Sequence, residues 1–286
     1  MKFKNMKDIK LIAIDLDDTL LGSDGQISER NILALKKASE KGLTIILATG
    51  RMTSCTEPFV DTIGIDCPVV VYNGAMVRDK RTLGRKILFH LPLEIEYSDT
   101  VIDYCFRNGF CLNLYVDEIL YSQDNPDTER FRNLYSGRTN AQYNLVDDLR
   151  IFRGKRSTKL ILITDHKSED VARTRDYQFE YFTRLFNGKV NLFRTDPEYL
   201  EIQNKNTDKG IGLGVYATKY KISRDQILAF GNGENDIAML KYAGTGVAVR
   251  NASDTVKKHA DFVAEWSNDE DCVARWIEEY ILTDPQ

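Results

Sequence analysis

The sequence predicts an α/β fold in which a doubly wound, mainly parallel sheet carries an inserted second domain. Apolar runs with the length and branching of buried strands are followed by polar segments, and helical patterns separate several of these runs. The middle of the chain then changes to a mixed helix and strand pattern. At 286 residues, the chain is long enough for a core domain and a second domain.

The first part of the core is expected to extend from residue 1 to residue 77. Residues 11–14 form the first predicted strand, and Ser28 is the expected N-cap of a helix that ends near Gly42. Residues 44–48 and 69–72 are the next two predicted strands, because both runs are short, apolar and rich in branched residues.

Residues 78–189 are expected to form the inserted α+β domain. This segment combines a helical pattern near 98–108, an alternating stretch at 111–121, a polar linker near 122–128 and a strand at 159–164. The chain is then expected to return to the core over residues 190–286. The strands predicted for this last part lie at 199–202, 227–230, 247–249 and 262–263.

An acidic segment, Asp15-Leu16-Asp17-Asp18-Thr19-Leu20, directly follows the first predicted strand. Open α/β sheets bind ligands beyond the carboxyl ends of their strands, and side chains two residues apart on an extended segment share a face. Asp15 and Asp17 are therefore expected to enter the crevice together. Because two close carboxylates repel each other, the pair favours a divalent cation such as Mg²⁺. The alternative is a solvated acidic turn.

Three more polar segments occupy equivalent positions. Two of them follow predicted strands, and the third lies at an expected helix start: Thr49-Gly50-Arg51, Gly231-Asn232-Gly233-Glu234-Asn235-Asp236 and Asp208-Lys209-Gly210. Thr49 offers a hydroxyl group, Gly50 lets a ligand approach the backbone, and Lys209 offers a positive charge beside exposed N–H groups. Taken singly, each segment is also typical of a solvated loop.

In their order along the chain, with Lys209 before the segment at 231–236, the four segments closely resemble those of the haloacid dehalogenase-like phosphatases, in particular the Cof-type sugar-phosphate phosphatases with a large cap. The resemblance covers nearly the whole chain and includes Asn73-Gly74-Ala75 and residues 267–271. It implies a Rossmann-like core over residues 1–77 and 190–286. It also implies that residues 78–189 are a cap that determines substrate specificity.

The residue types permit phosphoryl transfer, because a carboxylate can attack phosphorus and a second carboxylate can act as acid and base. The resemblance assigns the attack to Asp15 and the proton transfers to Asp17, whose backbone carbonyl would also hold Mg²⁺. The predicted phosphate-binding residues are Leu16, Thr49, Gly50, Lys209 and Asn235. The predicted metal-binding residues are Asp15, Asp17, Asn232 and Asp236.

Asn232 departs from the family pattern, which usually has an aspartate at this position. An amide oxygen can bind a hard cation but brings no negative charge, so weaker Mg²⁺ binding is expected. We still expect an active enzyme, because Asp15, Asp17 and Lys209 are all present.

Composition excludes several other classes of protein. The net charge of −4 argues against nucleic-acid binding, and no apolar run approaches the roughly 20 residues of a membrane span. The first ten residues lack the apolar centre of a signal peptide, which predicts a cytoplasmic protein. Five cysteines without paired spacing are expected to be reduced thiols, and three scattered histidines disfavour a zinc site. Gly210-x-Gly212-x-Gly214 follows no strand and is no dinucleotide motif.

The sequence therefore predicts a Mg²⁺-dependent phosphatase of small phosphorylated metabolites, with sugar phosphates as the expected substrates. One alternative is a phosphomutase of the same superfamily, which returns the phosphoryl group to a second hydroxyl. Another is a weakly active regulatory protein that binds a phosphorylated metabolite. The sequence does not indicate an oligomeric state.

Overall fold

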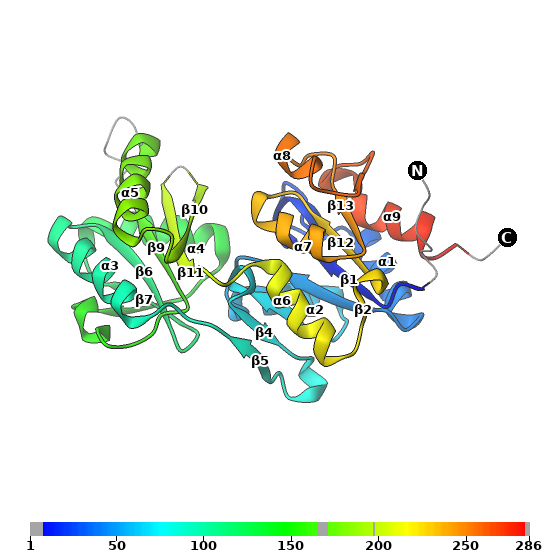
Figure 1. The fold of residues 1–286 in the computed structure, drawn as a ribbon, viewed down its shortest axis with the longest axis horizontal. Coiled ribbons are helices and arrows are strands. Elements are labelled where there is room, and N and C mark those ends of the chain that lie inside the picture. The colour runs from blue at the N-terminus through cyan, green and yellow to red at the C-terminus, as the bar shows by residue number, and fades with distance from the viewer. Residues whose placement is uncertain (1–7, 165–170, 197, 284–286) are drawn as a thin grey trace. The chain divides into compact units, whose positions relative to one another are not determined.

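The computed structural model describes residues 8–164, 171–196 and 198–283, and the chain forms two compact units (Figure 1). The core unit comprises residues 1–89 and 208–286, and the inserted unit comprises residues 90–207. Among the described residues, no helix is both long and apolar enough to cross a membrane.

The core unit is built on an eight-stranded sheet in the order β14-β13-β12-β1-β2-β3-β4-β5. The pairs from β14 to β3 are parallel, and β4 runs antiparallel to β3. This arrangement confirms the predicted α/β class. The strands are β1 (Leu11–Ile14), β2 (Thr44–Ala48), β3 (Val69–Val71), β4 (Met76–Arg78), β5 (Ile87–His90), β12 (Ile227–Gly231), β13 (Thr245–Ala248) and β14 (Phe262–Val263).

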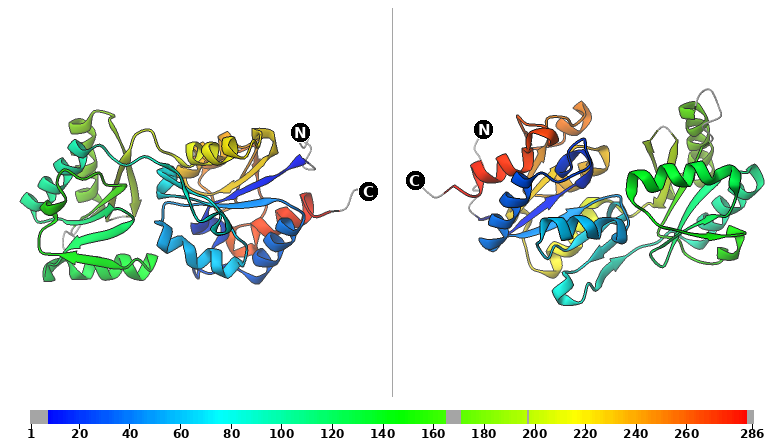
Figure 2. Two further views of the ribbon diagram at one scale, coloured as in Figure 1. Left: turned by 90° about the horizontal axis from the view of Figure 1, so that it is seen from below. Right: turned by 180° about the vertical axis from the view of Figure 1, so that it is seen from behind.

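Helices cover both faces of this sheet, which explains why its central strands are apolar along their whole length (Figure 2). Helices α1, α2 and α9 pack together on one face, and α6 and α7 pack together on the other. The predicted N-cap is confirmed, because the Ser28 side chain accepts the Asn31 N–H. The helices are α1 (Glu29–Glu40), α2 (Thr53–Ile63), α6 (Lys209–Lys219), α7 (Ile237–Tyr242), α8 (Asp254–Lys257) and α9 (Cys272–Tyr280).

The direction of chain winding changes next to β1. From β1, the chain adds β2 and then β3 on one side, whereas β12, β13 and β14 are added in turn on the other side. Ligands bind such sheets where the strand order reverses, at the carboxyl ends of the strands. In this sheet, that position is at the carboxyl ends of the neighbouring strands β1 and β12.

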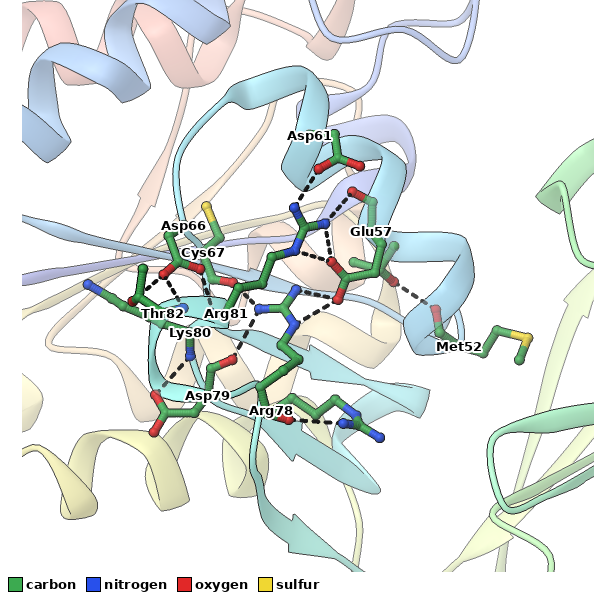
Figure 3. Close-up of polar contacts among 12 residues, drawn as sticks. Met52, Glu57, Asp61, Asp66, Cys67, Arg78, Asp79, Lys80, Arg81 and Thr82 are labelled. Atoms are coloured by element: carbon green, nitrogen blue, oxygen red, sulfur yellow. Dashed lines mark hydrogen bonds and ion pairs between the residues drawn. The ribbon is translucent and has the colours of Figure 1, made fainter.

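The expected start of the inserted domain at residue 78 does not match the compact units. Strands β4 and β5 belong to the core sheet, and ion pairs fix the turn between them to the core unit (Figure 3). The Arg81 guanidinium pairs with Glu57 and Asp61 of α2, and Arg85 Nε donates to Glu57 at 2.7 Å. Asp66 accepts the Arg81 N–H at 2.6 Å. These contacts join segments far apart in the sequence, so the local pattern could not reveal them.

The inserted unit contains a second, six-stranded sheet in the order β10-β11-β9-β6-β7-β8. Its pairs are antiparallel, except that β7 and β8 are parallel. The strands are β6 (Cys111–Val116), β7 (Ile119–Gln123), β8 (Tyr143–Val146), β9 (Lys159–Ile163), β10 (Val190–Asp196) and β11 (Tyr199–Asn204). The helices are α3 (Ile95–Asn108), α4 (Glu129–Thr139) and α5 (Val171–Phe186).

One expectation for this region needs correction. The predicted return to the core at residues 199–202 is wrong, because these residues lie in β11, which pairs with β9 and β10. The alternating stretch at 111–121 forms a hairpin, with Asp117 and Glu118 at its turn in the left-handed region. An apolar run fits any buried strand, so sequence alone did not show to which sheet β11 belongs.

Candidate active site

The core sheet brings the polar segments after β1, β2 and β12 together. Strand β1 pairs in parallel with both β2 and β12, so the segments that begin at Asp15, Thr49 and Asn232 all start at the carboxyl ends of neighbouring strands. Lys209 is the first residue of α6, as predicted. Its position is fixed by Asp208, whose side chain caps the helix by accepting the Ile211 N–H at 2.7 Å.

A buried ion triad, formed by Asp15, Lys209 and Asp236, lies at the carboxyl ends of β1 and β12. Lys209 Nζ is 2.6 Å from Asp15 Oδ1 and 2.5 Å from Asp236 Oδ1. The side chains of Lys209 and Asp236 are completely buried, and that of Asp15 is 7% exposed. When all three groups are ionised, the triad carries one uncompensated negative charge.

Burial and charge shift the pKa values within the triad. Burial, followed by repulsion from Asp236, raises the pKa of Asp15 from 3.8 to about 7, against the lowering effect of Lys209. Burial acts to lower the pKa of Lys209, but attraction to Asp15 and Asp236 outweighs it and raises that pKa above its ordinary value. Attraction to the two carboxylates thus favours the charged form of Lys209, whereas burial and Asp236 disfavour the charged form of Asp15.

The loop after β12 folds back onto Asp236. Asp236 Oδ2 accepts the backbone N–H groups of Asn232 at 2.9 Å and Gly233 at 2.8 Å. A Cβ on Gly231 would lie 2.5 Å from the Cβ of Asp236, so only glycine fits there. The half-buried Asn232 side chain accepts a hydrogen bond from the Thr19 hydroxyl at 3.0 Å. Thr19 had not been assigned a role from the sequence.

Asp17 has a different environment from Asp15. Its side chain is 53% exposed and forms a two-point ion pair with Arg51, at 2.6 Å from Nη2 and 3.0 Å from Nε. The structure therefore does not place the Asp17 carboxylate in the triad. Leu16, between the two aspartates, is buried and has an apolar side chain, so its backbone N–H is the group that is suited to bind phosphate.

The remaining predicted phosphate-binding residues lie around one asparagine. Thr49 is buried, and its hydroxyl accepts the Arg51 N–H at 3.2 Å. Asn235 Nδ2 donates to Asn73 Oδ1 at 3.0 Å, and the Asn73 side chain also lies against Gly50. Sequence reasoning assigned no role to Asn73, although its place directly after a buried strand was a usable signal.

Comparison with known proteins establishes the family. The sequence model of the haloacid dehalogenase-like hydrolases matches residues 12–277, which is most of the chain. The chain belongs to this family. Among the curated relatives, 5-amino-6-(5-phospho-D-ribitylamino)uracil phosphatase YitU of Bacillus subtilis is 29% identical over 274 residues, which cover 94% of this chain and 97% of that protein. The protein is a phosphatase of the haloacid dehalogenase-like type.

Solved structures of the family share the fold. A Thermotoga maritima protein is 29% identical with a TM-score of 0.83, and the match covers 96% of this chain and 98% of that one. A haloacid dehalogenase-like hydrolase from Bacteroides thetaiotaomicron is 27% identical with a TM-score of 0.84, covering 95% of this chain and 99% of that one. The predicted fold, a Rossmann-like core with an inserted cap domain, is thus confirmed.

The residues predicted to bind the metal offer the oxygen donors that Mg²⁺ prefers. No group of three or more aspartate, glutamate, histidine or cysteine side chains forms a metal site in the part of the chain that the structure describes. The predicted set instead combines the carboxylates of Asp15 and Asp236, the amide of Asn232 and the backbone carbonyl of Asp17. All are oxygen donors, which hard cations prefer, and the uncompensated charge of the triad favours a cation.

Proposed function

We propose that the protein is a Mg²⁺-dependent phosphatase that hydrolyses small phosphorylated metabolites through an aspartyl-phosphate on Asp15. The observation that supports this proposal is the buried ion triad at the carboxyl ends of β1 and β12. The buried ammonium of Lys209 contacts the carboxylate of Asp15, which directly follows β1. It is therefore suited to hold a phosphoryl group against that carboxylate.

In the first step, Asp15 attacks phosphorus and the bond from phosphorus to the ester oxygen breaks. Asp17 donates a proton to that leaving oxygen, which needs a carboxyl group in an environment unlike that of the nucleophile. Asp15 is buried and Asp17 is exposed beside Arg51, so the two carboxyl groups do have different environments. Because the ion pair with Arg51 favours the charged carboxylate, Asp17 must leave this pair to carry the proton. The products of this step are the free alcohol and the phosphorylated Asp15.

In the second step, Asp17 removes a proton from a water molecule, which attacks phosphorus and releases Asp15. Lys209, the hydroxyl of Thr49, the amide of Asn235 and the backbone N–H groups of Leu16 and Gly50 bind the phosphoryl oxygens in both steps. Mg²⁺ held by Asp15, Asp236, Asn232 and the Asp17 carbonyl would supply positive charge to the same oxygens.

The relatives support a phosphorylated sugar or sugar alcohol as substrate. Three Bacillus subtilis proteins, 27–29% identical to this chain, are named as phosphatases of 5-amino-6-(5-phospho-D-ribitylamino)uracil, a phosphorylated ribityl compound. We propose that the inserted unit selects the leaving group, as the sequence predicts for the cap. The cytoplasmic location is also part of this proposal.

A metabolite panel tests the function. Purified protein is incubated with sugar phosphates, phosphorylated sugar alcohols and the phosphorylated ribitylamino-uracil, with and without Mg²⁺, and released inorganic phosphate is measured. We expect Mg²⁺-dependent release from a subset of the panel and none from Asp15→Asn. Formation of an isomeric phosphate ester instead of inorganic phosphate would identify a mutase, and no reaction of any ester would contradict the proposal.

A further inference from the structure

We propose that Asn73 is a positioning residue that orients the carboxamide of Asn235 toward the transferring phosphoryl group. The proposal rests on the phosphatase function above, because it assigns Asn235 a phosphoryl contact. It adds a residue to which the sequence assigned no role.

The hydrogen bond between the two amides carries the proposal. An asparagine carboxamide has two N–H donors, and Asn235 Nδ2 uses one of them to donate to Asn73 Oδ1 at 3.0 Å. The plane of the carboxamide is then fixed, and with it the direction of the second N–H group. Asn235 is only half-buried, so without this contact its side chain has room for other rotamers.

The backbone that holds Asn73 is itself held in an unusual conformation. Tyr72, Asn73 and Gly74 have φ values of 52°, 49° and 92°, three consecutive residues in the left-handed region. Such a turn persists only when its surroundings fix it. Two hydrogen bonds do so, because the Asn73 N–H donates to the Thr49 carbonyl and the Tyr72 N–H donates to the Arg51 carbonyl, both at 2.9 Å.

The same turn also contacts the other phosphate-binding segments. A Cβ on Gly50 would lie 3.0 Å from Asn73 Oδ1, so the absence of a side chain there leaves room for the Asn73 amide. A Cβ on Gly74 would lie 1.9 Å from the Asp208 carbonyl oxygen, which places the turn directly against the start of α6 beside Lys209. Asn73 is therefore anchored from three sides, and the residue as a whole is 3% exposed.

A double-mutant cycle between Asn73 and Asn235 tests the inference. Asn73→Gly removes the side chain but tolerates the positive φ, and Asn140→Gly is the matched control, because Asn140 has a φ of 58° in the inserted unit. With an aryl phosphate as substrate, we expect Asn73→Gly to lower kcat/KM roughly tenfold in the wild-type background and less than about twofold in the Asn235→Ala background. Asn140→Gly should change neither value.

A conservative variant separates positioning from a structural role. Asn73→Asp keeps an acceptor for Asn235, so its effect on kcat/KM should be the same in both backgrounds. Equal losses for Asn73→Gly in the two backgrounds would overturn the inference, while Mg²⁺-dependent release by the wild type and an inactive Asp15→Asn would leave the proposed function intact. If Asn73→Gly does not fold, Asn73→Ser replaces it in the cycle, since its shorter side chain cannot reach Asn235.

Discussion

Lys209 is a completely buried ammonium between two carboxylates, and this burial changes what its removal should do. From the sequence, a lysine at a helix start suggests little effect on stability. The structure predicts otherwise, because Lys209→Ala leaves two buried carboxylates without their shared cation. We expect a loss of about 3–5 kcal/mol in the free energy of unfolding, together with loss of activity.

Urea unfolding of Lys209→Ala measures this loss. Lys219→Ala, an exposed lysine at the other end of α6, is the control and should change stability by less than about 0.5 kcal/mol. An unchanged unfolding midpoint for Lys209→Ala would show that the carboxylates do not depend on this cation.

Asn232 determines the charge of the proposed metal site. Replacing its amide by a carboxylate adds a charge at contact distance from Mg²⁺, although it also adds repulsion with Asp15 and Asp236 in the metal-free protein. We expect Asn232→Asp to lower the Mg²⁺ concentration for half-maximal activity roughly tenfold, with a smaller change in turnover at saturating Mg²⁺. A magnesium titration of both proteins measures this, and equal requirements would mean that Asn232 is not a ligand.

The strand-end residues could be predicted from the sequence, but the side chains that hold them in place could not. Asp15, Thr49 and Asn232 each follow an apolar run, which is a local signal. The partners found in the structure come from distant segments: Arg51 and Asp17 are 34 residues apart, Asn73 and Asn235 are 162 apart, and Thr19 and Asn232 are 213 apart. Only the folded sheet brings such residues together.

At the scale of elements, the turn between β4 and β5 depends on Asp66. Its carboxylate accepts the N–H groups of Arg81 and Thr82 at 2.6 and 2.9 Å. Burial alone would raise the pKa of Asp66, but the hydrogen bond from the Thr82 hydroxyl and those from the two N–H groups outweigh burial and lower the pKa below 3.8. A carboxyl group with a lowered pKa stabilises the folded protein above its ordinary pKa, and this contribution is lost as the pH falls through the folded-state value.

Asp66→Asn tests this contribution. We expect the variant to lose about 1 kcal/mol in the free energy of unfolding at pH 7, and the difference from the wild type to shrink as the pH falls below about 4. Chemical unfolding of both proteins at pH 7 and pH 3 measures it. A difference that is the same at both values would show that the carboxylate charge does not stabilise the turn.

The periodicity of the sequence predicts whether most segments are helices or strands, but it does not predict which of the two sheets a strand joins. The helix after Ser28 and the strands that carry the site match their patterns closely, because capping and buried apolar runs are local features. The sequence predicts no strand at 87–90 and places these residues in the inserted domain, and it places 199–202 in the core, whereas β5 belongs to the core sheet and β11 to the second sheet. Their membership depends on pairing with β4 and β9, which no short sequence window contains.

At the scale of the whole molecule, the inserted unit is one continuous stretch of chain with its own apolar core. Side chains from α3, α5 and one face of the second sheet form this core, and they include Val101, Leu112, Leu160, Phe182 and Ile202. We expect a fragment of residues 90–207 to unfold cooperatively with a free energy of roughly 5 kcal/mol. It should release no phosphate, because it lacks Asp15 and Lys209. A fragment without a cooperative transition would contradict this independence.

The proposed mechanism requires that Asp15 becomes phosphorylated during turnover. The most direct measurement is mass spectrometry of peptides from enzyme that is quenched in acid within one turnover of a good substrate. We expect one added phosphoryl group on the peptide that contains Asp15, and none in the Asp15→Asn protein. Phosphate release with no phosphorylated peptide, or with the phosphoryl group on another residue, would contradict it.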